Sequence, residues 1–451
     1  MSSLRHPGER DQHSAAVAAA PLCNGLTADV IDRTLLADDF RAVRQTTESL
    51  AANLSPEDQN LQSMPETSPV KWHRAHTTWF FETFVLKPHD RNWREIDPIW
   101  NYLFNSYYNG VGEQYPRPQR GLISRPDVAE IADYRCRVDE AMLELIEHSA
   151  EAGWQELAAI IRLGLNHEQQ HQELIATDLK HGFSRNPLHP AWTECPSTAP
   201  AGAAPLDWLG FDERIAEIGA ADDGRFCFDN ETPRHRQLVE AFELASRPVT
   251  CGEYLAFMED GGYDEPDLWL SDGWAWLQES GTRTPLYWRN GEDGQWWLYT
   301  LGGLRRVDPH EPVVHVSFYE ACAYAQWSGA RLPTEAEWEL AATSANHLDG
   351  PFADDRRYHP SAADPDLPND TLTGLFGNVW EWTASSYAPY PGFEAHPGAV
   401  GEYNGKFMAN QMVLRGGSCA TPAGHVRATY RNFFYPPDRW QFSGIRLARR
   451  P

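Results

Sequence analysis

A segment rich in proline and alanine, RNPLHPAWTECPSTAPAGAAPLDW at residues 185–208, divides the chain into two halves of different character. Low charge and frequent proline are typical of linkers, because such a sequence neither continues a helix nor supplies a hydrophobic core. With 451 residues, the chain is long enough for each half to bury a core of its own. The segment therefore predicts a linker between two domains.

The two halves differ in their periodicity. Residues 29–184 have helical periodicity, with breaks at proline-containing turns such as MPETSPV and QYPRPQRG, and predict a helical bundle. Residues 209–451 combine short alternating runs, such as RQLVEAFELA and PVVHVSF, with amphipathic helices at FYEACAYAQWSG and TEAEWELAATS. Residues 1–28 are small and polar without periodicity, so we expect them to be disordered. The predicted fold class is α+β with two domains.

Composition excludes several kinds of partner. The 64 acidic and 38 basic residues give a formal net charge of -26, which disfavours nucleic acid and anionic membranes. Seven cysteines without a C-x-x-C pair suit a reducing compartment. The N-terminal AAVAAAPLC makes a poor signal peptide, and no later run reaches the roughly 18 apolar residues of a membrane helix. We therefore expect a cytoplasmic protein that acts on small polar molecules.

The stretch LNHEQQHQEL, at residues 165–174, contains the pattern His-Glu-x-x-His, which is typical of zinc proteases but also fits other metal sites. The extended protease motif requires Gly at the position of Leu174 and His at the position of Thr177, and neither is present. A pair of hydrogen-bonded core histidines is the alternative to a metal site. At 100° per residue, one helix face carries Ile160, Leu163, His167, Gln170, His171, Leu174 and Asp178.

A third metal ligand is expected from the earlier segment SPVKWHRAHTTWFFETF, which contains His73 and His76. His76 lies with Phe80 and Thr83 on a stripe of helical period. Three neutral imidazoles bind a redox-active divalent metal as readily as zinc, so the ligands alone leave the ion open.

Several segments together resemble a known family. SPVKWHRAHTTWFFETFVL, NSYYNGVGEQYPRPQRGLISRP and LNHEQQHQEL resemble the DinB-like iron-binding four-helix bundle of the sulfoxide synthases of ergothioneine biosynthesis. After the linker, HVSFYEACAYAQWSGARLPTEAEWELA, LFGNVWEWTAS, VLRGGSCATP and SGIRLAR resemble the formylglycine-generating-enzyme type of C-type-lectin fold. The similarity spans about residues 35–450. CATPAGHVRATYR holds only Cys419, where formylglycine-generating enzymes have a cysteine pair, so copper-thiolate chemistry is not expected.

The resemblance implies iron(II) bound by His76, His167 and His171, with positions left for a substrate thiolate, a substrate imidazole and dioxygen. In this setting Glu168 is not a zinc-type base, and we expect it to be a solvated or inter-helix carboxylate.

The segment YYNGVGEQYPRPQR adds catalytic and binding candidates. Tyr108 or Tyr107 is predicted to donate a proton or hydrogen atom, with simple packing as the alternative role. Arg117 and Arg120 are predicted to clamp the carboxylate of the thiol substrate, with an exposed ion pair as the alternative.

Four further residues are predicted to bind hercynine (Nα-trimethylhistidine). The Gln170 amide can hydrogen-bond the substrate imidazole. In the family, the segment YRNFFYPPDRW closes the pocket over this betaine, which implies roles for Asn432, Phe433 and Phe434. The adjacent YY and FF pairs resemble the branch that uses free cysteine in place of γ-glutamylcysteine.

The leading functional hypothesis is an iron(II)- and O2-dependent oxidoreductase that joins the sulfur of cysteine, or of γ-glutamylcysteine, to hercynine and leaves a sulfoxide. A selenoneine-pathway synthase of the same architecture, which takes a seleno-sugar, is the enzymatic alternative. The alternative from another class is a non-catalytic lectin-like binding protein stabilised by zinc, although a closed structural zinc site needs a fourth protein ligand.

Overall fold

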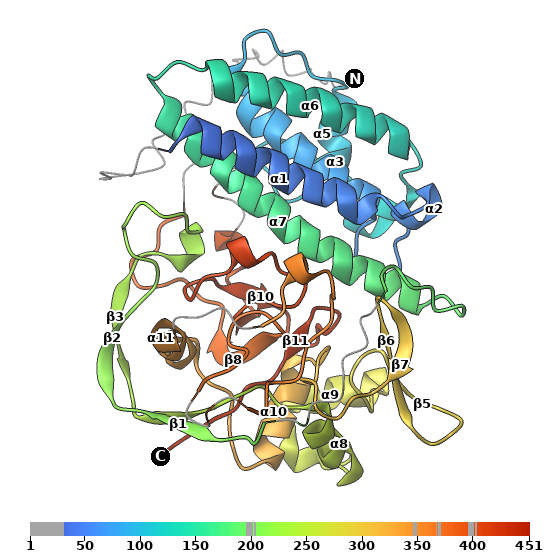
Figure 1. Ribbon diagram of the computed structural model, residues 1–451, viewed down its shortest axis with the longest axis vertical. Helices are drawn as coiled ribbons and strands as arrows, with labels where there is room; N and C mark the ends of the chain where they lie inside the picture. Colours follow the sequence, from blue (N-terminus) through green and yellow to red (C-terminus); the bar gives the residue numbers. More distant parts are fainter. Residues whose placement is uncertain are drawn as a thin grey trace, which may run out of the picture.

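The structure, a computed structural model, has two parts (Figure 1). A bundle of long helices is stacked on a second part that mixes short strands and helices, which is the α+β architecture predicted from the sequence. The segment predicted to be disordered lies outside the described residues, and the predicted linker lies partly outside them. The structure describes residues 31–194, 202, 204–345, 350–366, 368, 371–395, 401 and 404–451.

Long helices form the first part: α1 (Arg33–Ala51), α3 (Val70–Phe81), α6 (Val128–His148) and α7 (Trp154–Ser184). Shorter turns lie in their connections: α2 (Pro56–Gln59), η1 (Glu82–Leu86), α4 (Lys87–His89), α5 (Ile99–Phe104) and η2 (Arg117–Leu122). The side chains of Asp32 and Asp127 cap α1 and α6 by accepting hydrogen bonds from first-turn backbone N–H groups. Apolar faces of the long helices meet in a core that includes Phe40, Trp79, Val138 and Ile161.

Small sheets form the second part, with strand orders β1-β4-β12, β10-β9-β8-β11, β2-β3 and β5-β6-β7. The first strands are β1 (Trp208–Phe211), β2 (Arg214–Ile218), β3 (His235–Val239), β4 (Phe242–Ala245), β5 (Trp288–Asn290), β6 (Trp296–Thr300) and β7 (Gly303–Arg306). The later strands are β8 (Trp380–Ser386), β9 (Met412–Arg415), β10 (Asn432–Phe434), β11 (Ser443–Gly444) and β12 (Ala448–Arg449). The helices are α8 (Cys251–Glu259), α9 (Ser271–Ser280), α10 (Phe318–Trp327) and α11 (Glu335–Ala345).

Local predictions in this part are confirmed at two helices and wrong at one strand. The helices expected at FYEACAYAQWSG and TEAEWELAATS are α10 and α11. A capping box of Ser317 and Glu320 begins α10. The alternating run PVVHVSF is not a strand, because His315 adopts a positive φ of 66° and interrupts the extended backbone.

Helix α7 lies against the second part, as Figure 1 shows, and carries a line of polar contacts to it. One buried contact centres on Glu173, whose carboxylate accepts hydrogen bonds from Trp380 Nε1 (2.8 Å), Ser418 Oγ (2.6 Å) and Thr421 Oγ1 (2.6 Å). We use the term interdomain seam for four residues of α7 and their partners in the second domain. The α7 residues are Asn166, Gln170, Glu173 and Lys180, and the partners are His425, Tyr430, Trp380, Ser418, Thr421 and His315. The seam fixes the bundle on the second domain.

Among the described residues, no helix combines the length and apolar composition needed to cross a bilayer.

Candidate metal centre

Three histidine side chains converge inside the bundle. His76 comes from α3, and His167 and His171 lie one turn apart on α7. One possible ligand atom from each ring lies within 4.8 Å of the other two, and Nε2 of His76 is 3.2 Å from Nε2 of His167. All three residues are at most 7% exposed. In the part of the chain that the structure describes, no other His, Cys, Asp or Glu residues group in this way.

Burial keeps these imidazoles neutral. Desolvation lowers the pKa of His167 to about 4. It also lowers the pKa values of His76 and His171 well below the ordinary value, and neighbouring histidines lower them further. The neutral ring is the form that binds a metal ion. Three such rings fit a divalent ion such as iron(II) or zinc and leave coordination positions open.

The surroundings of His76 orient its ring. The carbonyl oxygen of Phe104 lies 2.6 Å from Nδ1 of His76 and can only accept a hydrogen bond. Nδ1 therefore carries the hydrogen, and Nε2 keeps its lone pair towards the other histidines. Trp72 stacks on the ring of His76 with 4.7 Å between centroids, and Phe80 lies 4.9 Å from the ring of His167. These apolar walls hold the imidazoles and restrict water.

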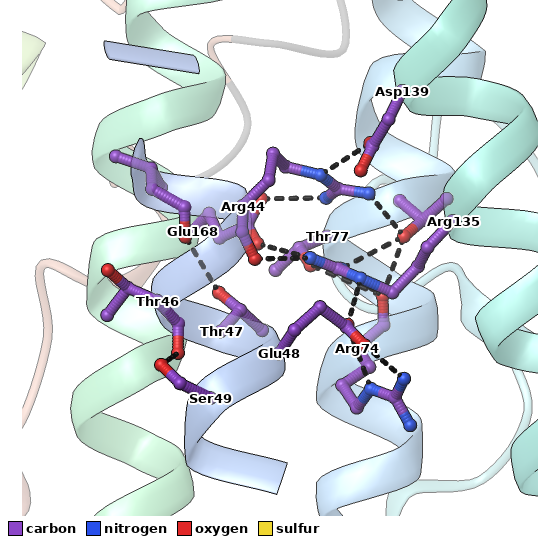
Figure 2. A network of polar contacts seen from close by, with 12 residues as sticks. Arg44, Thr46, Thr47, Glu48, Ser49, Arg74, Thr77, Arg135, Asp139 and Glu168 are labelled. Carbon is purple, nitrogen blue, oxygen red and sulfur yellow. Dashed lines mark hydrogen bonds and ion pairs between the residues drawn. The ribbon is translucent and has the colours of Figure 1, made fainter. Parts of the chain in front are cut away.

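The glutamate of the His-Glu-x-x-His pattern points away from the centre into a buried ion-pair network, which Figure 2 shows. Glu168 is fully buried and pairs with Arg44 (2.8 Å) and Arg135 (2.9 Å). Burial alone would raise the pKa of Glu168, but the two guanidinium groups lower it to about 2. Arg44 also pairs with Asp139 (2.7 Å). Glu168 is therefore an inter-helix carboxylate and not a solvated one, and it is unsuited to serve as a protease base.

The two predicted tyrosines occupy different surroundings. Tyr108 is 3% exposed, and its ring lies 5.7 Å from Trp79 and 6.4 Å from Phe80, whose rings also pack against the histidines. Tyr107 is half-buried, and its hydroxyl accepts a hydrogen bond from Arg117 Nη1 (2.6 Å). Its ring meets Phe407 of the second domain edge to face at 5.0 Å. Tyr108 thus lies in the aromatic layer beside the histidines, whereas Tyr107 faces the second domain.

The two predicted arginines also occupy different surroundings. Arg120 is 4% exposed, donates to Ser68 Oγ (2.9 Å) and Ser106 Oγ (3.0 Å), and stacks over Trp72 at 3.4 Å. Burial and the positive charge of Arg117 lower the pKa of Arg120 to about 9. Arg117 is only half-buried. Within the described residues, no carboxylate forms an ion pair with Arg120, so a buried positive charge lies one ring away from His76.

The predicted hercynine-binding residues come from α7 and β10. Gln170 Nε2 donates to Tyr430 Oη (2.7 Å), while its Oε1 is buried without a hydrogen-bond partner among the described residues. On β10, Phe433 stacks on Tyr387 with 4.0 Å between centroids. Phe434 instead packs edge-on against Trp440, and Asn432 Oδ1 accepts from the backbone of Phe433. Phe407 contacts both Tyr107 and Phe433, which connects the tyrosine loop to β10.

Two polar residues next to the histidines were not among the predicted site residues. His73 contacts His171, and Asp178 contacts His73. The sequence did carry a signal for both, because His73 precedes His76 by one helical turn and Asp178 lies on the predicted face of His167 and His171. Their contact could not be predicted, since it depends on how α3 packs against α7.

Comparison with known families agrees with this architecture. Residues 39–175 match the DinB superfamily, and residues 215–371 and 368–451 match the sulfatase-modifying factor enzyme 1-like domain. A DinB-type bundle with three converging histidines, joined to this second domain, defines a class of metal-dependent oxygenases.

Comparison with individual proteins identifies the family. Hercynine oxygenase of Mycolicibacterium thermoresistibile is 32% identical over 85% of this chain and 88% of its own length. The hercynine oxygenase of Mycolicibacterium smegmatis is 31% identical over 93% of this chain and 99% of its own. Ergothioneine biosynthesis protein 1 of Schizosaccharomyces pombe is 27% identical over 58% of this chain and 33% of its own. The chain belongs to the hercynine oxygenase family and is an oxidoreductase.

Proposed function

We propose that this protein joins the sulfur of cysteine to carbon 2 of the imidazole ring of hercynine and leaves a sulfoxide, as a step of ergothioneine biosynthesis. The C–H bond of the imidazole and the S–H bond of the thiol break, a C–S bond forms, and the sulfur gains one oxygen atom. Dioxygen is the four-electron oxidant, and its second oxygen atom leaves as water. The observation that carries this proposal is the group of three converging, neutral histidines in a chain that is similar to hercynine oxygenases.

His76, His167 and His171 would hold iron(II), which supplies the activation of dioxygen when bound. A structural zinc site is the less suitable interpretation, because such sites are closed by four protein ligands and only three groups converge among the described residues.

The thiol substrate is assigned to the side of Arg120. A buried guanidinium without an acidic partner favours the carboxylate of an amino acid, since pairing offsets its desolvation. Trp72 contacts both this guanidinium and the ring of His76, so a carboxylate held at Arg120 would place its thiol near the histidines. Arg117 would add a second, more exposed contact.

Hercynine is assigned to the side of Gln170 and β10. The buried Oε1 of Gln170 would accept the imidazole N–H, because its amide nitrogen is already used by Tyr430. Asn432, Phe433 and Phe434 would close this side, where aromatic rings suit a trimethylammonium group. Tyr108 is the proposed proton donor, through Oη, with Tyr107 as the second candidate.

Oxygen uptake, measured with different sulfur and selenium donors, tests the proposal. Protein loaded anaerobically with iron(II) should consume O2 in the presence of hercynine and cysteine and form the C–S product, identified by mass spectrometry. γ-Glutamylcysteine should be used less efficiently, because the adjacent Tyr107–Tyr108 and Phe433–Phe434 pairs resemble the cysteine-using branch. Preference for γ-glutamylcysteine would reject that branch, and preference for a seleno-sugar would favour the selenoneine-pathway synthase instead.

A further inference from the structure

A fourth buried histidine lies directly behind the metal centre. Nδ1 of His73 is 2.8 Å from Nδ1 of His171, and Nε2 of His73 is 3.1 Å from Oδ2 of Asp178. His73 is 2% exposed and Asp178 is 6% exposed. The backbone N–H of Ser68 donates to the same oxygen of Asp178 at 2.8 Å and so fixes the carboxylate.

The carboxylate of Asp178 determines the direction of each of these hydrogen bonds. An ionised carboxylate can only accept, so Nε2 of His73 carries a hydrogen. In the neutral ring, Nδ1 of His73 is then an acceptor, and Nδ1 of His171 must be the donor. This leaves the lone pair on Nε2 of His171, which is the nitrogen available to a metal ion. If Nδ1 of His73 also carried a hydrogen, Nε2 of His171 would have to carry one and would be blocked as a ligand.

We propose that His73 and Asp178 are positioning residues that fix the orientation and the tautomer of His171. The inference rests on the proposed metal centre and extends it. His73 is not itself a ligand, since both of its nitrogens are already used, and the three-histidine group does not include it. The Phe104 carbonyl serves His76 in the same way, so each of the two helices supplies a ligand held through its Nδ1.

Metal affinity tests the inference without relying on activity. Cobalt(II) is the probe, because its visible spectrum reports its ligands and its affinity can be measured by competition with a coloured chelator. His73→Phe keeps the ring next to Trp72 but removes both nitrogens. We expect it to bind cobalt(II) 10- to 100-fold more weakly, roughly the effect of losing such an outer partner of a ligand, and to change the spectrum. Affinity within twofold of the wild type and an unchanged spectrum would overturn the inference.

Three further variants separate the orientation of His171 from the folding of the protein. His181→Phe is the matched control, because His181 is a buried histidine of α7, the helix of His171, and contacts Ser63 instead of a metal-centre histidine. It should bind cobalt(II) as the wild type does, and a loss as large as that of His73→Phe would overturn the inference. Asp178→Asn keeps an oxygen that can accept from His73, so it should lose less affinity than Asp178→Leu.

If His73→Phe does not fold, the cobalt(II) affinities of the two Asp178 variants test the inference in its place. Affinities of both variants equal to that of the wild type would overturn it. If the wild-type protein does not bind cobalt(II), the proposed metal centre itself is overturned. If the wild type and all the variants bind cobalt(II) equally well, only the positioning role of His73 and Asp178 is overturned.

Discussion

At the scale of single residues, the charge of Arg120 is the feature that distinguishes this site from an ordinary aromatic core. Its guanidinium is buried, held by two serine hydroxyls and a tryptophan face, and has no acidic partner among the described residues. Such an arrangement is unfavourable unless an anion completes it, because a buried charge loses its hydration. The substrate carboxylate would be that anion.

Replacing this charge should affect one substrate more than the other. Arg120→Gln should raise the apparent KM for cysteine roughly 10- to 150-fold, which corresponds to losing charge-assisted hydrogen bonds of about 1.5 to 3 kcal/mol. The KM for hercynine should change far less. Arg125→Gln, at an exposed position of the same segment, is the control and should leave both values unchanged. An unaltered cysteine KM in Arg120→Gln would assign this arginine to folding alone.

Tyr108 offers a separate test of chemistry against packing. Phenylalanine keeps the ring that packs on Trp79 and Phe84 but removes the hydroxyl. Tyr108→Phe should therefore still bind the metal and both substrates and still consume oxygen, while its product shifts from the C–S sulfoxide towards cysteine sulfinate. The product ratio by mass spectrometry is the measurement. If Tyr107→Phe and the double variant also keep the wild-type ratio, the donor is another group.

At the scale of elements, helix α7 serves both domains with different faces. One face carries the histidines, another carries Glu168 towards α1 and α6, and a third forms the interdomain seam. The helical periodicity of the sequence predicts the face of His167 and His171, because the spacing of residues on one helix is a local property. It does not reveal the partners of Glu168, since Arg44 and Arg135 are contributed by distant helices.

The Glu168 network should control stability and not the reaction. Glu168→Gln removes the one fully buried carboxylate that Arg44 and Arg135 share and leaves them only Asp139 and Glu48, which are more exposed. We therefore expect about 3–5 kcal/mol of destabilisation in denaturant unfolding. Glu156→Gln, exposed on the same helix, should have no such effect. The metal-loaded variant should keep C–S bond formation under conditions where it is folded. Loss of activity with unchanged stability would instead give Glu168 a chemical role.

The same residue predicts a pH dependence. The folded-state pKa of Glu168, about 2, lies below its ordinary value of 4.5, so its contribution to stability is present above about pH 4.5. That contribution is lost as the pH falls towards 2, because the unfolded chain takes up the proton first. Unfolding measured between pH 5 and pH 3 should therefore show a steeper loss of stability in the wild type than in Glu168→Gln. Parallel curves would contradict the assignment.

The interdomain seam gives a prediction about cooperativity. Glu173→Ala leaves the Trp380 indole N–H and the hydroxyls of Ser418 and Thr421 without their buried acceptor, at a cost of about 1–3 kcal/mol for each group left unsatisfied. We expect the two domains to unfold in separate transitions. Glu173→Gln should unfold more like the wild type, because an amide oxygen can still accept from Trp380. A single wild-type transition in Glu173→Ala would show that the seam is not what couples the domains.

At the scale of the whole molecule, the fold was more predictable from the sequence than the site. Periodicity and the Pro/Ala-rich segment predict a helical half and a mixed half, because both signals are local. The split of the predicted arginine pair and the different surroundings of Tyr107 and Tyr108 depend on how η2 and the second domain pack, which no spacing reveals. His315 is a further case, since its positive φ turns an alternating run away from strand geometry.

The proposed function requires the histidine centre of the bundle and the second domain to perform oxygen-dependent C–S bond formation together. The most direct test supplies ¹⁸O₂ to the iron(II)-loaded protein with hercynine and cysteine and measures the mass of the product. We expect a hercynine–cysteine adduct that contains one ¹⁸O atom and is absent when the protein is loaded with zinc. Iron-loaded, folded protein that consumes no oxygen with these substrates, or an adduct without ¹⁸O, would contradict it.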